Sequence, residues 1–336
     1  MMQINEIEAI KSLLATPKKI GIIPHRNPDG DAMGSTLGLY HILKQLQHEV
    51  VVIAPNEFPE FLSWLPESEN VLIFERNIEQ SKAILQDCEM IFTLDFNALH
   101  RTGEAMEKVL ESLTATSIMI DHHQFPDGYA TYTFSDTSYG STCQMIYDFI
   151  YQLGFENYIN KTVATCLYTG IVTDSGSFRF PKTTSKTHQC VADLIDRGIN
   201  NSEIHNLLFD NSSYNSLLLL GKALQNLKIL DHYKTSYITL SQEELDAFGH
   251  QKGDTEGIVN YGLSINGIDF TAIFIENKEE GIIKISFRSQ GDFDVNQFAR
   301  KHFNGGGHIN AAGGKSFSSL EETVQQFIAI LASEKK

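Results

Sequence analysis

Three groups of acidic residues and histidines follow three apolar segments of the sequence. His25, Asp29 and Asp31 lie in HRNPDGDAMGS directly after KIGII, Asp95 follows MIFTL, and the triplet 121–123 (DHH) follows SIMI. If each apolar segment is a strand of one parallel sheet, these side chains meet at the carboxyl ends of the strands, where open α/β sheets bind ligands. Ionised carboxylates gathered there repel one another unless cations compensate them. The pattern therefore predicts a site for divalent cations.

Asp174 is a fourth candidate ligand, because it follows the apolar run LYTGIVT and precedes the flexible SGS. Carboxylate and imidazole ligands without thiolates favour manganese or magnesium over cobalt, iron or zinc. The first group also has a structural interpretation, since Asn-Pro-Asp-Gly is a strong turn sequence and Asp29 or Asp31 could cap the helix that follows. The recurrence of polar groups after three separate apolar segments favours the metal site.

The elements around these residues predict an α/β fold. From Lys19 to about Asp121, short apolar runs alternate with helical patterns, which is typical of a doubly wound, mostly parallel sheet with helices on both faces. A largely helical stretch follows and continues through SYNSLLLLGKALQNLKIL. From near Ser236 the pattern changes to half-buried strands, with IDFTAIFIEN and GIIKISFRS forming a hairpin. Ser319 and Glu322 have capping-box spacing before the last helix.

A chain of 336 residues is long enough for two domains. We expect a metal-binding catalytic domain over 1–195, a helical connector over 196–230 and a smaller α+β substrate-binding domain over 231–336. The active site is expected in the cleft between the two domains.

Composition restricts the partners. The 26 basic and 42 acidic residues give a net charge of −16, which repels long duplex DNA but still allows a short oligonucleotide or a mononucleotide. The four cysteines form no C-x-x-C pair and are expected to be buried free thiols. The N-terminal segment MMQINEIEAIKSLL is amphipathic and resembles neither a signal peptide nor a membrane span, so a cytoplasmic protein is expected.

These residues resemble the DHH phosphoesterase family, whose name is the triplet at 121–123. A later glycine-rich segment, GGGH, resembles the motif of the C-terminal domain that accompanies this family. The length of the chain and the FRSQG and GGGH segments are most similar to the nanoRNase branch, which also dephosphorylates 3′-phosphoadenosine 5′-phosphate (pAp). The matching positions span most of the chain: His25, Asp29, Asp31, Asp95, Asp121, His122, His123, Asp174, Gly305, Gly306, Gly307, His308, Ala311, Ala312 and Gly313.

The resemblance implies two divalent cations, with Mn²⁺ expected and Mg²⁺ or Co²⁺ as alternatives. It implies one cation on His25 and Asp29, the other on Asp31, His122 and Asp174, and Asp95 as the bridge between them. Two such ions activate a bridging water and stabilise the attacking and leaving oxygens of an in-line displacement. The catalytic residues are then Asp95, Asp121 and His123, with Asp121 behind the ligands and His123 against the scissile phosphate.

The resemblance also implies a substrate-binding set in the C-terminal domain. Arg288 and His308 would hold the second phosphate or the terminal nucleotide across the cleft, and the glycines would let the backbone approach that phosphate. Without the family match, GGGH would be interpreted as a loop that ends the helix VNQFARKHF. The expected substrate-binding residues are Arg288, Ser289, Gly306, Gly307 and His308.

The function expected is hydrolysis of oligoribonucleotides of a few nucleotides (nanoRNA) to mononucleotides, dephosphorylation of pAp, or both. Alternatives on the same scaffold are a cyclic- or linear-dinucleotide phosphodiesterase, an exopolyphosphatase, a manganese pyrophosphatase and a RecJ-like exonuclease. An alternative of another class is a nucleotide-binding regulator without turnover, which the complete set of six metal positions disfavours. The sequence leaves the substrate preference, the polarity of cleavage and the oligomeric state, a homodimer included, undecided.

Overall fold

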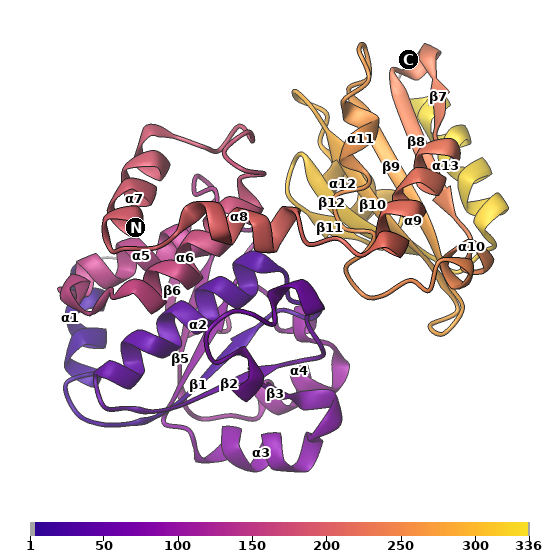
Figure 1. The fold of residues 1–336 in the computed structure, drawn as a ribbon. Coiled ribbons are helices and arrows are strands. Elements are labelled where there is room, and N and C mark those ends of the chain that lie inside the picture. The colour runs from indigo at the N-terminus through magenta and orange to yellow at the C-terminus, as the bar shows by residue number, and fades with distance from the viewer. Residues whose placement is uncertain (1–3, 335–336) are drawn as a thin grey trace. The chain divides into compact units, whose positions relative to one another are not determined.

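The computed structural model describes residues 4–334, which divide into two compact units (Figure 1). The first unit ends at Asn211 and the second begins at Ser212. Each unit contains one six-stranded sheet. The two-part organisation predicted from the sequence is therefore present, with an α/β unit followed by a smaller α+β unit.

The first unit is built on a sheet whose strands are all parallel. The order β3-β2-β1-β4-β5-β6 places β2 on one side of β1 and β4 on the other, so the order reverses between β1 and β4. In open α/β sheets this reversal opens a crevice at the carboxyl ends of the strands, where ligands bind. The strands are β1 (Lys19–Pro24), β2 (Glu49–Ala54), β3 (Leu72–Ile73), β4 (Met90–Leu94), β5 (Thr116–Asp121) and β6 (Tyr132–Ser135).

Helices cover both faces of this sheet, because its central strands are apolar on both sides (Figure 1). Ile22 of β1 belongs to the core under α1, α2, α5 and α6, whereas the adjacent Ile23 belongs to the core under α3 and α4. The helices are α1 (Ile4–Leu13), α2 (Gly30–Gln45), α3 (Ile78–Asp87), α4 (Glu104–Glu111), α5 (Thr142–Leu153), α6 (Lys161–Asp174), α7 (Ser185–Asp196) and α8 (Asn201–Phe209).

The amphipathic N-terminal segment forms α1, which buries Ile7 and Ile10; residues 1–3 of that segment lie outside the described residues. All four cysteines are buried free thiols, as predicted. None of the helices within residues 4–334 combines the length and hydrophobicity that crossing a membrane requires.

The second unit contains a mixed sheet in the order β11-β12-β10-β9-β8-β7. The predicted hairpin is confirmed, since β9 and β10 pair antiparallel, whereas β8 and β9 pair parallel. The strands are β7 (Lys228–Leu230), β8 (Thr235–Leu240), β9 (Phe270–Asn277), β10 (Ile282–Ser289), β11 (Gly306–Gly307) and β12 (Ala311–Ser316).

A phenylalanine-rich core lies between one face of this sheet and the helices α12 and α13, and a smaller aliphatic core lies under α9 and α10. The predicted capping box is present, because the Glu322 carboxylate accepts from the Ser319 N–H and the Ser319 hydroxyl accepts from the Glu322 N–H. The helices are α9 (Tyr214–Gln225), α10 (Gln242–Ala247), α11 (Asn260–Leu263), α12 (Val295–His302) and α13 (Leu320–Glu334).

The helical prediction through LKIL is wrong at its end. Helix α9 stops at Gln225, and Lys228–Leu230 pairs with β8 as strand β7. The Asn226 side chain donates to the carbonyl of Thr239 on β8 (2.8 Å), which ties the chain to the sheet where the helix ends. The predicted connector over 196–230 therefore contains α8, in the first unit, and α9 and β7, in the second.

Candidate metal centre

The first predicted group lies where β1 passes into α2. Asp29 is the N-cap of α2, and its Oδ1 accepts from the backbone N–H groups of Asp31 (3.0 Å) and Ala32 (3.1 Å). Its other oxygen, Oδ2, faces His25 Nε2 at 3.9 Å. The structural and the functional interpretations of Asp29 are thus compatible, because each uses a different carboxylate oxygen.

Asp95 follows β4 in a left-handed backbone conformation, with φ of 65°. Its backbone N–H donates to the carbonyl of Ile120 on β5, and only 2% of the residue is exposed. A left-handed aspartate is uncommon, and such strain persists where the surrounding structure enforces it. The conformation fixes the Asp95 carboxylate at the edge of the sheet, beside the end of β5.

The DHH triplet begins with the last residue of β5. Asp121 is fully buried, and its carboxylate accepts from the His123 backbone N–H (2.8 Å) and contacts His123 Nδ1 (2.6 Å). His122 and His123 are also buried. Asp121 therefore orients the ring of His123.

Asp174 reaches the same place from another element, the end of α6. Helices α2 and α6 pack closely because glycines line their contact. A Cβ atom at Gly34 would lie 2.5 Å from the Cys166 carbonyl oxygen, and one at Gly170 would lie 2.7 Å from Asp31 Oδ1. The last turn of α6 thus lies beside the first turn of α2, which carries Asp31.

The six predicted metal ligands are brought together at the carboxyl end of the first sheet. The candidate ligand atoms of His25, Asp29 and Asp95 lie within 4.8 Å of one another, and so do those of Asp31, His122 and Asp174. Asp95 contacts both groups, since its Oδ2 lies 3.3 Å from His25 Nε2 and its Oδ1 lies 3.4 Å from His122 Nε2. The geometry thus contains two adjacent ligand groups joined by one carboxylate.

Both histidines of these groups are oriented by the backbone. His25 Nδ1 contacts the carbonyl of Arg26 (2.8 Å), and His122 Nδ1 contacts the carbonyl of Tyr139 (3.3 Å). A carbonyl only accepts, so Nδ1 of each ring donates a proton to it, which directs Nε2 at the carboxylates and leaves Nε2 as the nitrogen that a cation could bind. This arrangement is the usual one for a histidine that binds a metal. The residues present therefore fit divalent cations.

The pKa values of the buried aspartates and of His122 are shifted because several negative charges lie close together. Burial together with the neighbouring Asp95 raises the pKa of Asp31 to about 7 and that of Asp121 to about 6. Burial and the proximity of Asp31 raise the pKa of Asp174 well above its usual range. Burial opposes the charged form of His122, but its contacts with Asp95 and Asp174 outweigh burial and raise its pKa to about 10. The centre thus retains protons that bound cations would replace.

Arg101 is a half-buried cation at this centre that was absent from the predicted set. It lies in a short 3₁₀ helix, Leu99–Thr102, and its backbone carbonyl accepts from the Arg26 N–H (2.8 Å), which places it beside the β1–α2 loop. The pKa of His123 lies well below 6.5, mainly because the ring is buried and secondly because the positive charge of Arg101 is close to it. No carboxylate within the described residues 4–334 forms an ion pair with the Arg101 guanidinium. The sequence signal that could have identified Arg101 is a basic residue that follows an apolar strand within a few positions.

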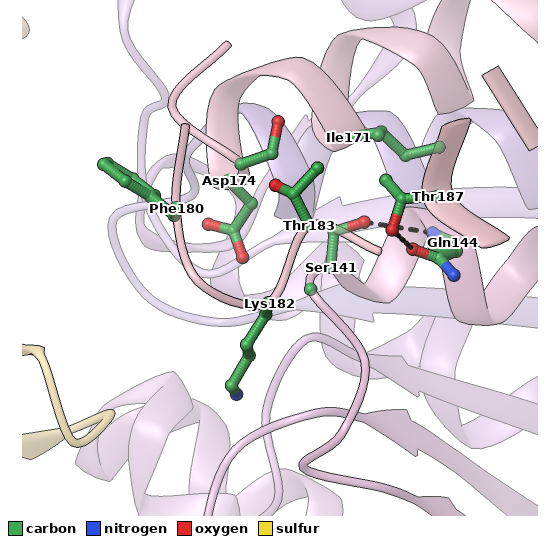
Figure 2. Close-up of a pocket in the computed structure, with 10 residues that line it drawn as sticks. Ser141, Gln144, Ile171, Asp174, Phe180, Lys182, Thr183 and Thr187 are labelled. Carbon is green, nitrogen blue, oxygen red and sulfur yellow. Dashed lines mark hydrogen bonds between the residues drawn. The ribbon is translucent and has the colours of Figure 1, made fainter. Parts of the chain in front are cut away.

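A small pocket adjoins Asp174 (Figure 2). Figure 2 shows its polar wall, where Thr187 donates to Gln144 Oε1 and the Gln144 N–H donates to Ser141. The half-buried Lys182 also lines it; burial lowers the pKa of Lys182, and the charges of Asp174 and Asp121 oppose that shift. The pocket therefore brings a second cation near the carboxylates.

The predicted substrate-binding residues lie at one end of the second sheet. Arg288 on β10 is in register with Ala311 on β12, and the Ser289 N–H donates to the Asn310 carbonyl (3.0 Å). His308 follows β11 in the β11–β12 hairpin, where its N–H donates to the Ala311 carbonyl (2.7 Å). The structure thus gathers Arg288, Ser289 and residues 306–308 within the second unit.

The glycines of GGGH have a role in the hairpin itself. A Cβ atom at Gly305 would lie 1.9 Å from the Gly313 carbonyl oxygen, and Gly307 has φ of 153°. The Gly307 N–H donates to the buried side chain of Asn296 on α12 (2.9 Å). The close approach of the two backbone segments therefore requires these glycines, whether or not a ligand binds there.

Known proteins resemble the chain over nearly its whole length. It is 32% identical over 302 residues to the bifunctional oligoribonuclease and PAP phosphatase NrnA of Thermus thermophilus, covering 90% of this chain and 85% of the relative. The identity to the protein of the same name from Bacillus subtilis is 32% over 304 residues, covering 88% and 90%. The crystal structure of an exopolyphosphatase-related protein from Bacteroides fragilis superposes with a TM-score of 0.94 at 37% identity, covering 100% of this chain and 98% of that one.

Two domain families match the two units separately. The DHH family N-terminal domain matches residues 19–171, which contain β1 to β6 and most of α6, and the DHHA1 domain matches residues 234–335. With both domains matched and relatives of more than 30% identity along the chain, this protein belongs to the DHH family.

Proposed function

We propose that the protein is a metal-dependent phosphoesterase that hydrolyses short oligoribonucleotides to mononucleotides and dephosphorylates pAp. The observation that carries the proposal is the pair of ligand groups joined by Asp95 at the carboxyl end of the first sheet. The substrates come from the two NrnA relatives, whose names state both activities. The same substrates were expected from the resemblance to the DHH phosphoesterase family.

We propose two Mn²⁺ ions as the cofactors, one held by His25 and Asp29 and the other by Asp31, His122 and Asp174. Asp95 would bridge them, consistent with its contacts to both histidines. When bound, the cations would supply an activated water and stabilise the negative charge that develops on the phosphate.

The protein's own side chains around the ligands have separate proposed roles. His123 would contact the scissile phosphate through Nε2, because its Nδ1 is directed at Asp121 (2.6 Å) and the ring is thereby oriented. Burial and Arg101 hold the pKa of His123 well below 6.5 in the absence of substrate, and the negative charge of a bound phosphate would favour the imidazolium, whose Nε2–H can donate to a phosphate oxygen. The Arg101 guanidinium would bind a phosphate oxygen and supply positive charge beside the carboxylates.

We propose that the second unit binds the remainder of the substrate. Arg288 would bind a phosphate, His308 would donate to the same nucleotide, and Ser289 would line that site. Ser289 is itself held in place, since it donates to the Phe293 carbonyl and accepts from the Asn310 side chain. Gly306 and Gly307 would shape the hairpin that presents His308.

The test is Mn²⁺-dependent hydrolysis of a panel that contains a dinucleotide, a five-nucleotide RNA, pAp, a cyclic dinucleotide and pyrophosphate. The wild type is compared with Asp95→Asn, which removes the shared carboxylate charge, and with Asp87→Asn as a matched control. Asp87 is an exposed aspartate that pairs with Lys19. We expect Asp87→Asn to retain activity. Asp95→Asn should lose Mn²⁺ affinity by at least about 100-fold, which is more than the loss of a residue that only contacts a metal ligand usually causes.

Cleavage of the dinucleotide and pAp, lost only in Asp95→Asn, would support the proposal. Activity confined to the cyclic dinucleotide or to pyrophosphate would retain the metal centre and overturn the substrate assignment. Full activity of Asp95→Asn would overturn the proposed metal centre. Mn²⁺ binding without hydrolysis of any substrate would favour a nucleotide-binding regulator.

A further inference from the structure

The first turn of α5 contacts the carboxylates of both ligand groups. Ser141 is the N-cap of this helix, and Thr142 is its first residue. Thr142 is fully buried. It follows neither an apolar strand nor a metal-ligand motif, and it is not among the six predicted ligands.

Two backbone groups of this turn bind Asp31. The Thr142 N–H donates to Asp31 Oδ2, and the Cys143 N–H donates to Asp31 Oδ1 (2.9 Å). The first N–H groups of a helix have no partner within the helix and carry partial positive charge. The start of α5 therefore holds a buried carboxylate with two donors and partly neutralises it.

The Thr142 side chain binds the other carboxylate. Its hydroxyl donates to Asp95 Oδ1 (2.8 Å), the oxygen that faces His122 Nε2 at 3.4 Å. Asp95 Oδ2 faces His25 Nε2. A single residue thus contacts Asp31 through its backbone and the shared carboxylate through its side chain.

We propose that Thr142 is a positioning residue that holds Asp31 and Asp95 in their ligand orientation before the cations bind. The inference rests on the proposed metal centre and extends it to a residue that is not a ligand. Without the hydroxyl, Asp95 loses a buried donor and can rotate, so part of the binding free energy must be used to order it. Partners of metal ligands commonly contribute about 10- to 100-fold to metal affinity.

The experiment compares the wild type with Thr142→Val and Thr142→Ser. Valine keeps the backbone N–H and the shape of threonine but lacks the hydroxyl, whereas serine keeps the hydroxyl. Mn²⁺ affinity is measured directly, by isothermal titration calorimetry on the metal-free protein, and hydrolysis is then measured across a range of Mn²⁺ concentrations.

We expect Thr142→Val to weaken Mn²⁺ binding by about tenfold or more and to recover most of its kcat at saturating Mn²⁺. Thr142→Ser should bind Mn²⁺ within a few-fold of the wild type. A purely structural role would lower stability without this shift in Mn²⁺ dependence. Equal Mn²⁺ affinity in the wild type and Thr142→Val would overturn the inference.

Three further results also decide the test. If Thr142→Val does not fold, Thr142→Ala is the substitute, because it removes the hydroxyl without placing a methyl group against the carboxylate, and its affinity is judged in the same way. Failure of the wild type to bind Mn²⁺ would overturn the proposed function together with the inference. Loss of affinity in Thr142→Ser equal to that in Thr142→Val would overturn the role of the hydroxyl alone.

Discussion

Backbone carbonyls orient the two candidate histidine ligands, and this arrangement defines their chemistry. His25 and His122 each direct Nδ1 at a carbonyl, so Nε2 faces the carboxylates in both cases. His123 differs, because its Nδ1 is directed at the carboxylate of Asp121. We therefore propose different roles for these adjacent histidines, with His122 binding a cation and His123 contacting the substrate.

Arg101 leads to a prediction at the scale of a single residue. Arg101→Ala should lower kcat/KM for the dinucleotide and pAp by about 10- to 100-fold, because a hydrogen bond to a charged group contributes about 1.5–3 kcal/mol. Mn²⁺ affinity should change little, since within residues 4–334 the Arg101 side chain is neither a candidate ligand nor hydrogen-bonded to one. Arg101→Lys should recover only part of the loss, because an ammonium lacks the paired donors of a guanidinium. Steady-state kinetics and Mn²⁺ titration of both variants check this.

The control for Arg101 is Arg76→Ala, which removes an exposed arginine that pairs with Glu57. This variant should have wild-type kinetics. If Arg76→Ala lowered kcat/KM as much as Arg101→Ala, the effect would come from net charge and not from a contact with the phosphate.

At the scale of elements, the contact between α2 and α6 carries a second prediction. Gly170→Ala should destabilise the fold by about 1–3 kcal/mol, the usual cost of overpacking, because the new Cβ would lie 2.2 Å from Cys143 Sγ. Mn²⁺ affinity should fall as well, since the same Cβ would displace Asp31. Urea unfolding and Mn²⁺ titration measure the two effects.

Gly221→Ala on α9 is the matched control for Gly170→Ala. No heavy atom lies within 4 Å of a Cβ placed at Gly221, so the substitution should be neutral or stabilise the helix by up to about 1 kcal/mol. Unfolding of Gly170→Ala at the wild-type urea concentration would show that the two helices can separate without cost, which contradicts the close packing described above.

Elements differ in how well the sequence predicted them. Strands β1, β4 and β5 were predictable because each is an uninterrupted apolar run, and their parallel order brings His25, Asp95 and the DHH triplet together. Strand β12 was not predicted, because AAGGKS lacks the residues that favour strands. Its pairing depends on a close backbone approach that glycine alone allows.

The sequence contained an unused signal for the position of Asp174. Gly30, Gly34 and Gly38 recur every four residues on α2 and meet α6. That spacing places them on one face of the helix, but periodicity in one helix does not identify its partner. Thr142 was missed for a related reason, since a serine–threonine helix start is common and only the tertiary contacts connect it to Asp31 and Asp95.

At the scale of the whole molecule, net charge predicts a preference for short substrates. With a charge of −16, phosphates that extend beyond the site meet a repulsive field. The kcat/KM should therefore decrease along a series of RNAs from two to about twenty nucleotides, and added salt should reduce the difference by screening the repulsion. A rate that rises with length, or a decrease unaffected by salt, would exclude repulsion as the cause.

The division into two units predicts where cations act in the molecule. Because all six candidate ligands lie in the first unit, Mn²⁺ should raise the free energy of unfolding of that unit, by about 2.7 kcal/mol at a concentration 100 times its Kd. In hydrogen exchange, Mn²⁺ alone should protect the segments around residues 25–31, 95 and 121–123. It should leave the β10 strand and the β11–β12 hairpin unchanged until a nucleotide is added. Protection of the hairpin by Mn²⁺ alone would place a cation ligand in the second unit, and EDTA should reverse every metal-dependent change.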